Sequence, residues 1–183
     1  MTATLEREIK LVFDSLDAAR AAVVATGATP LHGRRLQEDC LLDTCNDDLR
    51  RRRSALRVRQ DGGRCILTFK GPVQEGSIKI REELETIVAD GSVLMRILGE
   101  LGFQVWFRYE KYREEFALDD CIIAIDETPV GVFVEIEGGD IAQAAGLLGR
   151  GPGDYVLDSY RGLFVRHCEQ LGLEPTDMLF DED

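Results

Sequence analysis

Hydrophobic and polar residues alternate with a period of two along most of this chain, which is the pattern of β-strands with one polar face. In residues 4–13, charged residues occupy positions 6, 8 and 10, and apolar residues occupy positions 5, 9 and 11. The same alternation predicts further strands over residues 33–43, 55–60, 64–70, 77–88, 103–118, 121–126 and 130–137. The chain is therefore expected to form eight strands, most of which carry charge on one side.

Turn and cap residues separate these strands and predict the helices between them. Asp61–Gly63 lies between two alternating segments and is a strong hairpin signal. Ser15 can cap a helix that ends near residue 26, and Ser92 can cap another that ends near residue 102. Further helical segments are expected over residues 141–148 and from about Ser159 to Leu171.

No linker or internal repeat divides the 183 residues, and a chain of this length is within the usual size of one domain. We expect a single domain over residues 1–173 and an acidic, mobile tail over residues 174–183. Eight antiparallel strands can close into a barrel that holds one small ligand. Because the helices must cover apolar strand faces, the charged faces turn toward the barrel axis. The predicted fold is thus α+β: an eight-stranded antiparallel closed β-barrel with flanking helices.

Two sets of charged side chains share the inward phase of these strands. The acidic set comprises Glu6, Glu8, Asp39, Asp43, Glu83, Glu85, Asp126, Glu135 and Glu137. The basic set comprises Lys10, Arg57, Arg59, Lys70, Arg81, Lys111 and Arg113. In a closed barrel, nine carboxylates and seven cations would therefore face one confined space.

Such a space implies strong electrostatic interactions. Two like charges about 4 Å apart repel by roughly 4 kcal/mol at an effective dielectric near 20. The pairs Glu6/Glu8 and Glu135/Glu137 would meet this cost unless they are protonated, solvated or bound to a metal. Carboxylates suit Mg²⁺ or Mn²⁺, and basic side chains suit phosphate oxygens, so the pattern indicates metal-assisted phosphoryl chemistry. The alternative is that each charged face meets bulk water and pairs across strands.

The overall charge of the chain limits the classes of partner that it is expected to bind. With 22 basic and 34 acidic residues the net charge is −12, which argues against a general nucleic-acid binder because phosphate contacts need a basic surface. No apolar run reaches the roughly 18 residues of a membrane span, and residues 1–10 lack an apolar secretory segment. Five cysteines without a Cys-x-x-Cys pair do not indicate a disulfide framework or a zinc site. We expect a cytoplasmic protein with a small-molecule partner and neither a nucleic-acid nor a membrane partner, and leave a homodimer open.

The order of the charged blocks resembles that of a known family. Residues 6–10, E-R-E-I-K, have the form E-x-E-x-K, and Ser159-Tyr160 closes the matching order. The blocks between them are Leu56–Arg59, Leu67–Gly71, Arg81–Glu85, Lys111–Arg113, Asp126 and Gly131–Gly138. E-x-E-x-K alone is a weak signal, but the ordered set is specific and covers nearly the whole chain. The chain thus resembles the CYTH superfamily, the triphosphate tunnel metalloenzymes.

This resemblance implies an eight-stranded antiparallel tunnel that binds a triphosphate together with divalent metal, Mg²⁺ or Mn²⁺. By motif position, the metal ligands would be Glu6, Glu8, Asp126, Glu135 and Glu137. The phosphate-binding residues would be Lys10, Arg57, Arg59, Lys70, Arg81, Lys111 and Arg113. The catalytic residues would be Glu83, Glu85 and Lys70, with the two carboxylates positioning metal-bound water or the basic side chains.

Members of this superfamily include thiamine triphosphatases, inorganic triphosphatases and class IV adenylyl cyclases. Hydrolases and cyclases share the triphosphate grip but differ in the nucleophile, which is water in one and a ribose 3′-hydroxyl in the other. No residue is an evident hydrogen-bonding partner for the edge of an adenine base. We therefore expect a metal-dependent triphosphatase that acts on inorganic triphosphate, thiamine triphosphate or a nucleoside triphosphate. The alternatives are a class IV adenylyl cyclase, which converts ATP to cyclic AMP and pyrophosphate, and a non-catalytic polyphosphate- or nucleotide-binding module.

Three features outside these blocks have both a structural and a functional interpretation. The run Arg50–Arg53 is more typical of a solvated loop whose positive charge balances nearby acidic residues, although it could also steer an anionic substrate toward the barrel. Trp106 and Tyr109 favour core or rim packing over stacking on a base or a thiamine ring. His32 and His167 are isolated in the sequence and favour surface or capping roles.

Overall fold

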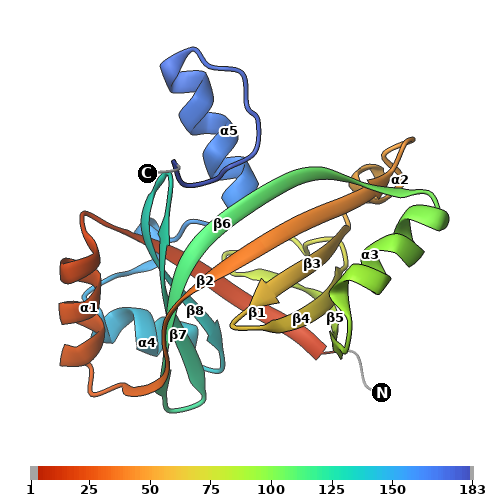
Figure 1. The fold of residues 1–183 in the computed structure, drawn as a ribbon. Coiled ribbons are helices and arrows are strands. Elements are labelled where there is room, and N and C mark those ends of the chain that lie inside the picture. Colours follow the sequence, from red (N-terminus) through yellow and green to blue (C-terminus); the bar gives the residue numbers. More distant parts are fainter. Residues whose placement is uncertain (1–3, 182–183) are drawn as a thin grey trace.

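The structure, a computed structural model, describes residues 4–181 and has eight strands closed into one barrel (Figure 1). The strands are β1 (Thr4–Phe13), β2 (Thr29–Thr44), β3 (Ala55–Asp61), β4 (Arg64–Lys70), β5 (Lys79–Val88), β6 (Phe103–Leu118), β7 (Cys121–Thr128) and β8 (Gly131–Gly138). Around the barrel they follow the order β1-β5-β4-β3-β2-β6-β7-β8, and β8 returns to pair with β1. Neighbouring strands are antiparallel throughout. This arrangement confirms the predicted fold class.

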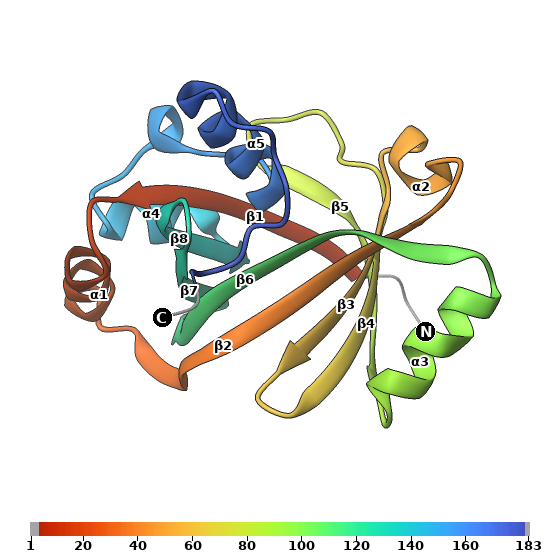
Figure 2. The same cartoon turned by 45° about the horizontal axis from the view of Figure 1, so that its top comes forward.

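The two longest strands, β2 and β6, lie side by side across the barrel (Figure 2). The alternation predicts a start for β2 near Gly33, but the strand begins four residues earlier, at Thr29. Pro30 and Gly33 weaken the local strand signal, yet β6 supplies partners for this segment, with Thr29 opposite Ala117. Register shifts between residues 30 and 35 accommodate the two irregular residues. Pairing with a distant strand therefore overrides the local preference.

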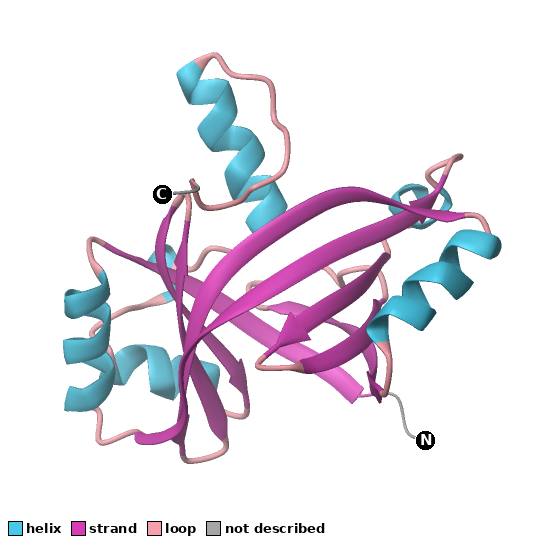
Figure 3. Cartoon of the chain, viewed as in Figure 1, coloured by secondary structure: helices cyan, strands magenta, loops and turns pink. Residues whose placement is uncertain are grey.

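The helices lie outside the barrel wall (Figure 3). They are α1 (Leu16–Ala25), α2 (Asp48–Arg51), α3 (Gly91–Glu100), α4 (Ile141–Leu147) and α5 (Tyr160–Leu171), with a 3-10 turn at Pro152–Asp154. Ser15 caps α1 as predicted, because its Oγ accepts a hydrogen bond from the Ala18 N–H at 3.1 Å. Ser92 does not cap α3. Instead, Asp90 Oδ1 accepts from the N–H groups of Ser92 and Val93 at 2.9 and 3.0 Å, and its negative charge suits the positive end of a helix.

Apolar side chains fill the space between the helices and the outer faces of the strands. Beneath α1 and α4, the buried side chains include Ile9, Leu11, Val23, Ile123, Ile136 and Ala145. Beneath α3, a second cluster contains Leu42, Val58, Cys65 and Leu98. Burial of each large aliphatic side chain stabilises the fold by about 1.5–3 kcal/mol. The main apolar core thus lies outside the barrel wall, which leaves the barrel interior for charge.

The segment after α5 differs from the predicted mobile tail. Met178 is fully buried, and its backbone pairs with β6: its N–H donates to Arg108 O and its carbonyl accepts from Glu110 N–H, each at 2.9 Å. The Phe180 ring lies 5.2 Å from that of Tyr112. The segment is therefore docked on β6 in the structure, and Met178 and Phe180 anchor it among acidic neighbours. Residues 182 and 183 of the predicted tail lie outside the described residues.

In the described part of the chain, no helix combines the length and the apolar character that crossing a membrane would require.

Candidate functional site

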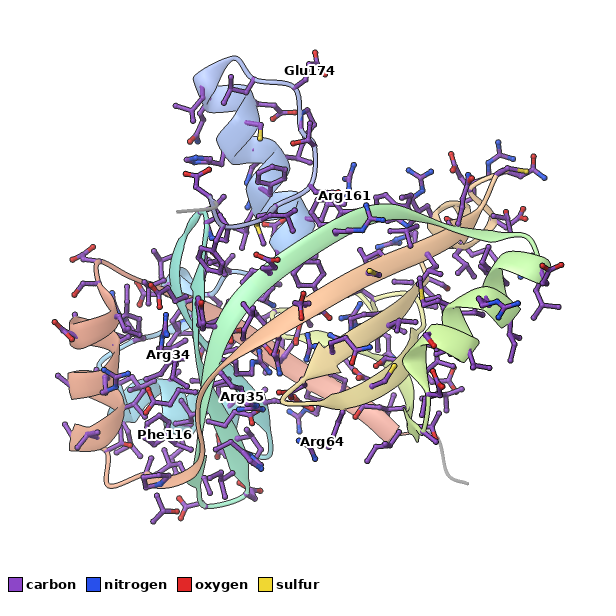
Figure 4. All side chains as sticks on the ribbon, viewed as in Figure 1. Arg34, Arg35, Arg64, Phe116, Arg161 and Glu174 are labelled. Carbon is purple, nitrogen blue, oxygen red and sulfur yellow. The ribbon has the colours of Figure 1, made fainter. Side chains whose placement is uncertain are left out.

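A cavity of about 570 Å³ occupies the interior of the barrel, and we call it the central cavity. Its wall is dominated by charged side chains, several of which appear as sticks inside the barrel in Figure 4. The basic lining residues are Lys10, Arg35, Arg57, Arg59, Arg64, Lys70, Lys79, Arg81, Lys111, Arg113 and Arg161. The acidic lining residues are Glu6, Glu8, Asp61, Glu83, Glu85, Glu115, Glu135 and Glu137. The wall thus carries more basic than acidic side chains, which corrects the predicted acidic excess.

The alternation of the strands places these charges inside the barrel. On β1, Glu8 and Lys10 face the central cavity, whereas Ile9 and Leu11 face outward beneath the helices. The charged side chains are removed from bulk water: only 2% of Lys111 is exposed. The alternative interpretation, that the charged faces of the strands meet bulk water, is therefore wrong.

The central cavity brings together nearly all the residues predicted from sequence. Every predicted phosphate-binding residue, the three predicted catalytic residues and four of the five predicted metal ligands line it, and Asp126 is the exception. The position of Glu85 is the most open of this set, with 47% of its side chain exposed. Whether these residues bind metal or phosphate stays a prediction, but their convergence is a property of the fold.

Most of the predicted metal ligands contact basic side chains. Glu6 lies between Lys70, at 2.5 Å, and Arg81, at 2.7 Å. Burial and the charge of Glu8 raise the pKa of Glu6, but Lys70 and Arg81 outweigh them and hold the pKa below its usual value. Glu8 accepts hydrogen bonds from Lys10 and Lys79. These carboxylates are therefore ionised and already paired.

Asp126 is a buried junction behind the cavity wall. Arg113 donates to both of its oxygens, at 2.7 and 2.6 Å, while Lys111 Nζ donates at 2.9 Å and Tyr160 OH at 2.5 Å. Burial raises the pKa of Asp126, but Arg113 and Lys111 prevail and lower it to about 2. Because Tyr160 begins α5, Asp126 connects β6 and β7 to that helix. Its oxygens hold other side chains in place behind the wall, whereas the other four predicted metal ligands line the cavity itself.

Glu137 is the carboxylate whose charge is least compensated. Across β1 and β8 it stands opposite Glu8, and no basic side chain of residues 4–181 lies within 4.0 Å of it. Burial, followed by the charges of Glu135 and Glu6, raises the pKa of Glu137 to about 7. In the same interior, burial and Arg113 lower the pKa of Lys111 to about 7.

The arrangement of the carboxylates determines how well the cavity suits a divalent cation. Among the described residues, no group of three or more His, Cys, Asp or Glu side chains converges in a metal-ligand arrangement, because Glu6, Glu8 and Glu135 turn toward lysines and arginines. Burial raises the pKa of Glu137 most, and the charges of Glu135, Glu6 and Glu8 raise it further, as expected where carboxylates gather in excess. A hard divalent cation relieves such an excess, and carboxylate oxygens are the ligands that Mg²⁺ and Mn²⁺ prefer. The donor set around Glu137 therefore fits such an ion by its chemistry.

Two predicted inward carboxylates have structural surroundings instead. Asp43 accepts hydrogen bonds from the N–H groups of Thr44, Leu49 and Arg50, at 2.8–3.0 Å, and so holds the turn between β2 and α2. Asp39 is buried behind the cavity wall, where Arg59 donates to both of its oxygens. The alternation gave the right phase for both residues, but phase alone cannot distinguish the cavity from the wall behind it.

Several lining residues were not assigned from the sequence. Lys79, Arg35, Asp61 and Glu115 continue the inward alternation of their strands, so the same signal could have found them. Arg161 has no such signal, because it lies on a helix and reaches the central cavity only through the packing of α5.

Comparison with known proteins identifies the family to which the chain is related. The CYTH domain family matches residues 4–148. A Methanocaldococcus jannaschii protein named as a candidate adenylate cyclase is 32% identical over 105 residues, which span 57% of this chain and 60% of that protein. Among solved structures, a Vibrio parahaemolyticus protein, also named as a candidate adenylate cyclase, has a TM-score of 0.77 at 19% identity, covering 88% of this chain and 98% of its own.

A Hippeastrum protein has a TM-score of 0.62 at 19% identity, covering 93% of this chain and 97% of its own, and is described as a candidate adenylyl cyclase with a dominant triphosphatase activity. At such identities the two structural matches establish a common fold. The family match covers most of the chain and includes the strands that carry the charged interior. By this match and by its fold, the chain belongs to the CYTH domain family.

Proposed function

We propose that this protein is a divalent-metal-dependent phosphohydrolase that acts on triphosphate-containing substrates held in the central cavity. The observation that carries the proposal is the set of eleven basic side chains around a cavity of about 570 Å³, a volume suited to one small ligand. A triphosphate offers many acceptor oxygens, which match these donors in charge and number.

The ion pairs of the central cavity suggest how such a substrate would bind. Lys70 contacts Glu6 and Glu83, and Lys10 contacts Glu8 and Glu135. Phosphate oxygens would replace these carboxylates as acceptors for the lysine ammonium groups. Three of the released carboxylates, Glu6, Glu8 and Glu135, belong to the predicted metal-ligand set, so substrate binding would prepare the site for the metal.

The metal would be held by Glu6, Glu8, Glu135 and Glu137, which line the cavity and surround the excess of negative charge. Bound Mg²⁺ or Mn²⁺ would neutralise phosphate oxygens and favour ionisation of water. Asp126 would act instead by positioning Lys111 and Arg113.

Glu83 and Lys70 are the candidate proton-handling pair. Burial raises the pKa of Glu83 although Lys70 Nζ lies only 2.7 Å from it, and a carboxylate with a raised pKa is a suitable acceptor for the proton of an attacking water. Lys70 would orient this carboxylate until phosphate binds. Glu85 would act at the open side of the cavity, where it accepts a hydrogen bond from Thr68 at 3.1 Å.

An adenylyl cyclase is the second candidate, and the names of the Methanocaldococcus and Vibrio relatives favour it. It would use the same phosphate grip, with the ribose 3′-hydroxyl attacking the α-phosphorus and pyrophosphate leaving. The description of the Hippeastrum protein, which stresses triphosphatase activity, favours hydrolysis.

A product assay distinguishes these functions. The protein is incubated with ATP, thiamine triphosphate or inorganic triphosphate, each with Mg²⁺, with Mn²⁺ and with a chelator. Metal-dependent release of orthophosphate supports the proposal, whereas cyclic AMP with pyrophosphate favours the cyclase. Binding without any product would identify a non-catalytic binding module. Lys10→Met, which removes one buried cation of the central cavity, is the matched control for a contaminating phosphatase.

A further inference from the structure

Most basic side chains of the central cavity have a carboxylate partner. Lys10 lies 3.1 Å from Glu8, and Arg35 lies 2.5 Å from Asp61. Arg161, in the first turn of α5, lines the same cavity. No carboxylate of residues 4–181 lies within 4.0 Å of its guanidinium. Its charge is therefore unmatched in the described part of the protein.

The Arg161 guanidinium packs against aromatic rings. Its central carbon lies 4.8 Å from the ring centroid of Trp106 and 5.7 Å from that of Phe107. Arg50 of α2 approaches the same Trp106 ring, at 4.4 Å, but Arg50 also pairs with Asp43. Two guanidinium groups thus share one indole ring, and only that of Arg50 has a carboxylate acceptor.

The aromatic faces attract this part-buried guanidinium, but they supply no anion to balance its charge. Burial, together with the charge of Arg50, lowers the pKa of Arg161, yet an arginine stays charged at neutral pH. The presence of this charge beside a cavity, where an anion could enter, points to a site that is completed by a ligand.

The neighbouring residues give the chemical class of that ligand. Tyr160 directly precedes Arg161, and the Nζ atoms of Lys10 and Lys111 lie 5.1 and 4.8 Å from its ring centroid. Arg161 therefore extends the set of predicted phosphate-binding cations toward α5. Figure 4 labels Arg161 near the base of α5, apart in this view from Arg35 and Arg64, which line the same cavity.

We propose that Arg161 is a further substrate-binding residue, which binds the phosphoryl group at the α5 end of a triphosphate chain. This inference rests on the proposed function and deepens it by assigning the recognition of chain length. A guanidinium can donate two parallel hydrogen bonds to one phosphoryl group. On this proposal Arg161 contacts the third phosphoryl group, which a diphosphate held by Lys10 and Lys111 lacks, so this residue favours the longer chain.

The test is isothermal titration of the full chain with inorganic triphosphate and with inorganic pyrophosphate, in chelator so that no turnover occurs. Arg161→Gln should raise the Kd for triphosphate about tenfold, as expected for the loss of a charge-assisted hydrogen bond, and that for pyrophosphate less than twofold. Arg161→Lys should give an intermediate Kd for triphosphate, because lysine keeps the positive charge but cannot donate two parallel hydrogen bonds to one phosphoryl group. The control is Arg166→Gln on the same helix, an exposed residue paired with Asp158 at 2.8 Å, which should leave both constants unchanged.

Thermal melts without ligand separate binding from a structural role. If the role of Arg161 is to bind an anion, Arg161→Gln should change the melting temperature of the ligand-free protein little, because the wild-type side chain loses no carboxylate partner and only aromatic contacts. A lower melting temperature with unchanged triphosphate binding would overturn the proposal, as would equal weakening for the two phosphates. Failure of the wild type to bind triphosphate would reject the proposed function itself. Tight wild-type binding that Arg161→Gln leaves intact would reject only the role of Arg161.

Discussion

In the middle of β1 the two strand faces are both buried, but they are stabilised in opposite ways. On the outer face of β1, Ile9 and Leu11 gain free energy by leaving water beneath the helices. On the inner face of the same strand, Glu8 and Lys10 lose hydration, and an ion pair at 3.1 Å offsets part of that cost. The outer face therefore supplies stability, whereas the inner face holds charged groups in place for a ligand.

The largest effect is expected at Asp126, where the inner face is most tightly connected. Asp126→Ala removes the acceptor of Lys111, Arg113 and Tyr160 and leaves two buried cations short of a partner. The free energy of unfolding should fall by about 3–5 kcal/mol, measured by chemical denaturation. The exposed Asp14 provides the control, since Asp14→Ala should change stability by less than about 0.5 kcal/mol. A loss below about 1 kcal/mol at Asp126 would show that its ion pairs do not hold the barrel together.

A substitution on the outer face should affect stability without affecting chemistry. Ile9→Ala leaves a cavity in the apolar core and should cost about 2–5 kcal/mol, while turnover per folded molecule stays unchanged. The adjacent inner-face change Lys10→Met should do the reverse, abolishing turnover at a smaller cost in stability. Denaturation curves and product assays on the two variants measure the contrast, and similar profiles for both would remove the distinction between the faces.

The pH dependence of stability tests the raised pKa of Glu137, which burial and then the neighbouring carboxylates cause. Its pKa in the folded protein is about 7, above the ordinary value of 4.5, so folding is favoured by protonation. The contribution of this group to stability is full below about pH 4.5 and is lost as the pH rises through 7. Without metal, Glu137→Gln should therefore be more stable than the wild type at pH 8, by up to about 3 kcal/mol, and equal to it at pH 4.

Denaturation of both proteins across this pH range provides the measurement, and parallel stability curves would contradict it. In the presence of Mg²⁺, the same substitution should lower turnover by about 100-fold, because a proposed metal ligand loses its charge. Glu6→Gln should have a similar effect on turnover, whereas unchanged activity of both variants at saturating Mg²⁺ would reject the metal assignment.

The smallest effect concerns the coupling of the two proposed ligands on the inner face. Each ligand at about 100 times its dissociation constant should stabilise the fold by roughly 2.7 kcal/mol, which raises the melting temperature by several degrees. Triphosphate would release carboxylates for the metal, so the two together should stabilise by more than the sum of their separate effects. Thermal melts with neither, either and both, using a non-hydrolysable triphosphate, measure this coupling. A strictly additive response would mean that triphosphate does not release the carboxylates from their lysine partners for the metal.

Much of the fold and of the candidate site could be predicted from the alternation of charged and apolar residues. The predicted bounds of β1 and β6 agree with the structure, and the phase of Lys10, Arg57 and Lys111 places them in the central cavity. These predictions succeeded because a strand has only two faces. The start of β2 and the docking of Met178 could not be predicted in this way, since both depend on β6 as a distant partner.

By itself, the sequence determined which residues could face inward, because the period of a strand and the need to cover apolar faces leave one arrangement for Glu8 and Ile9. The tertiary structure decided how far inward each charge lies and which partner it meets. Asp126 and Glu137 share the predicted phase, but the first is surrounded by cations and the second by carboxylates. Such differences arise from distances between strands and helices that are far apart in the chain, and electrostatic energy depends on those distances rather than on the order of residues.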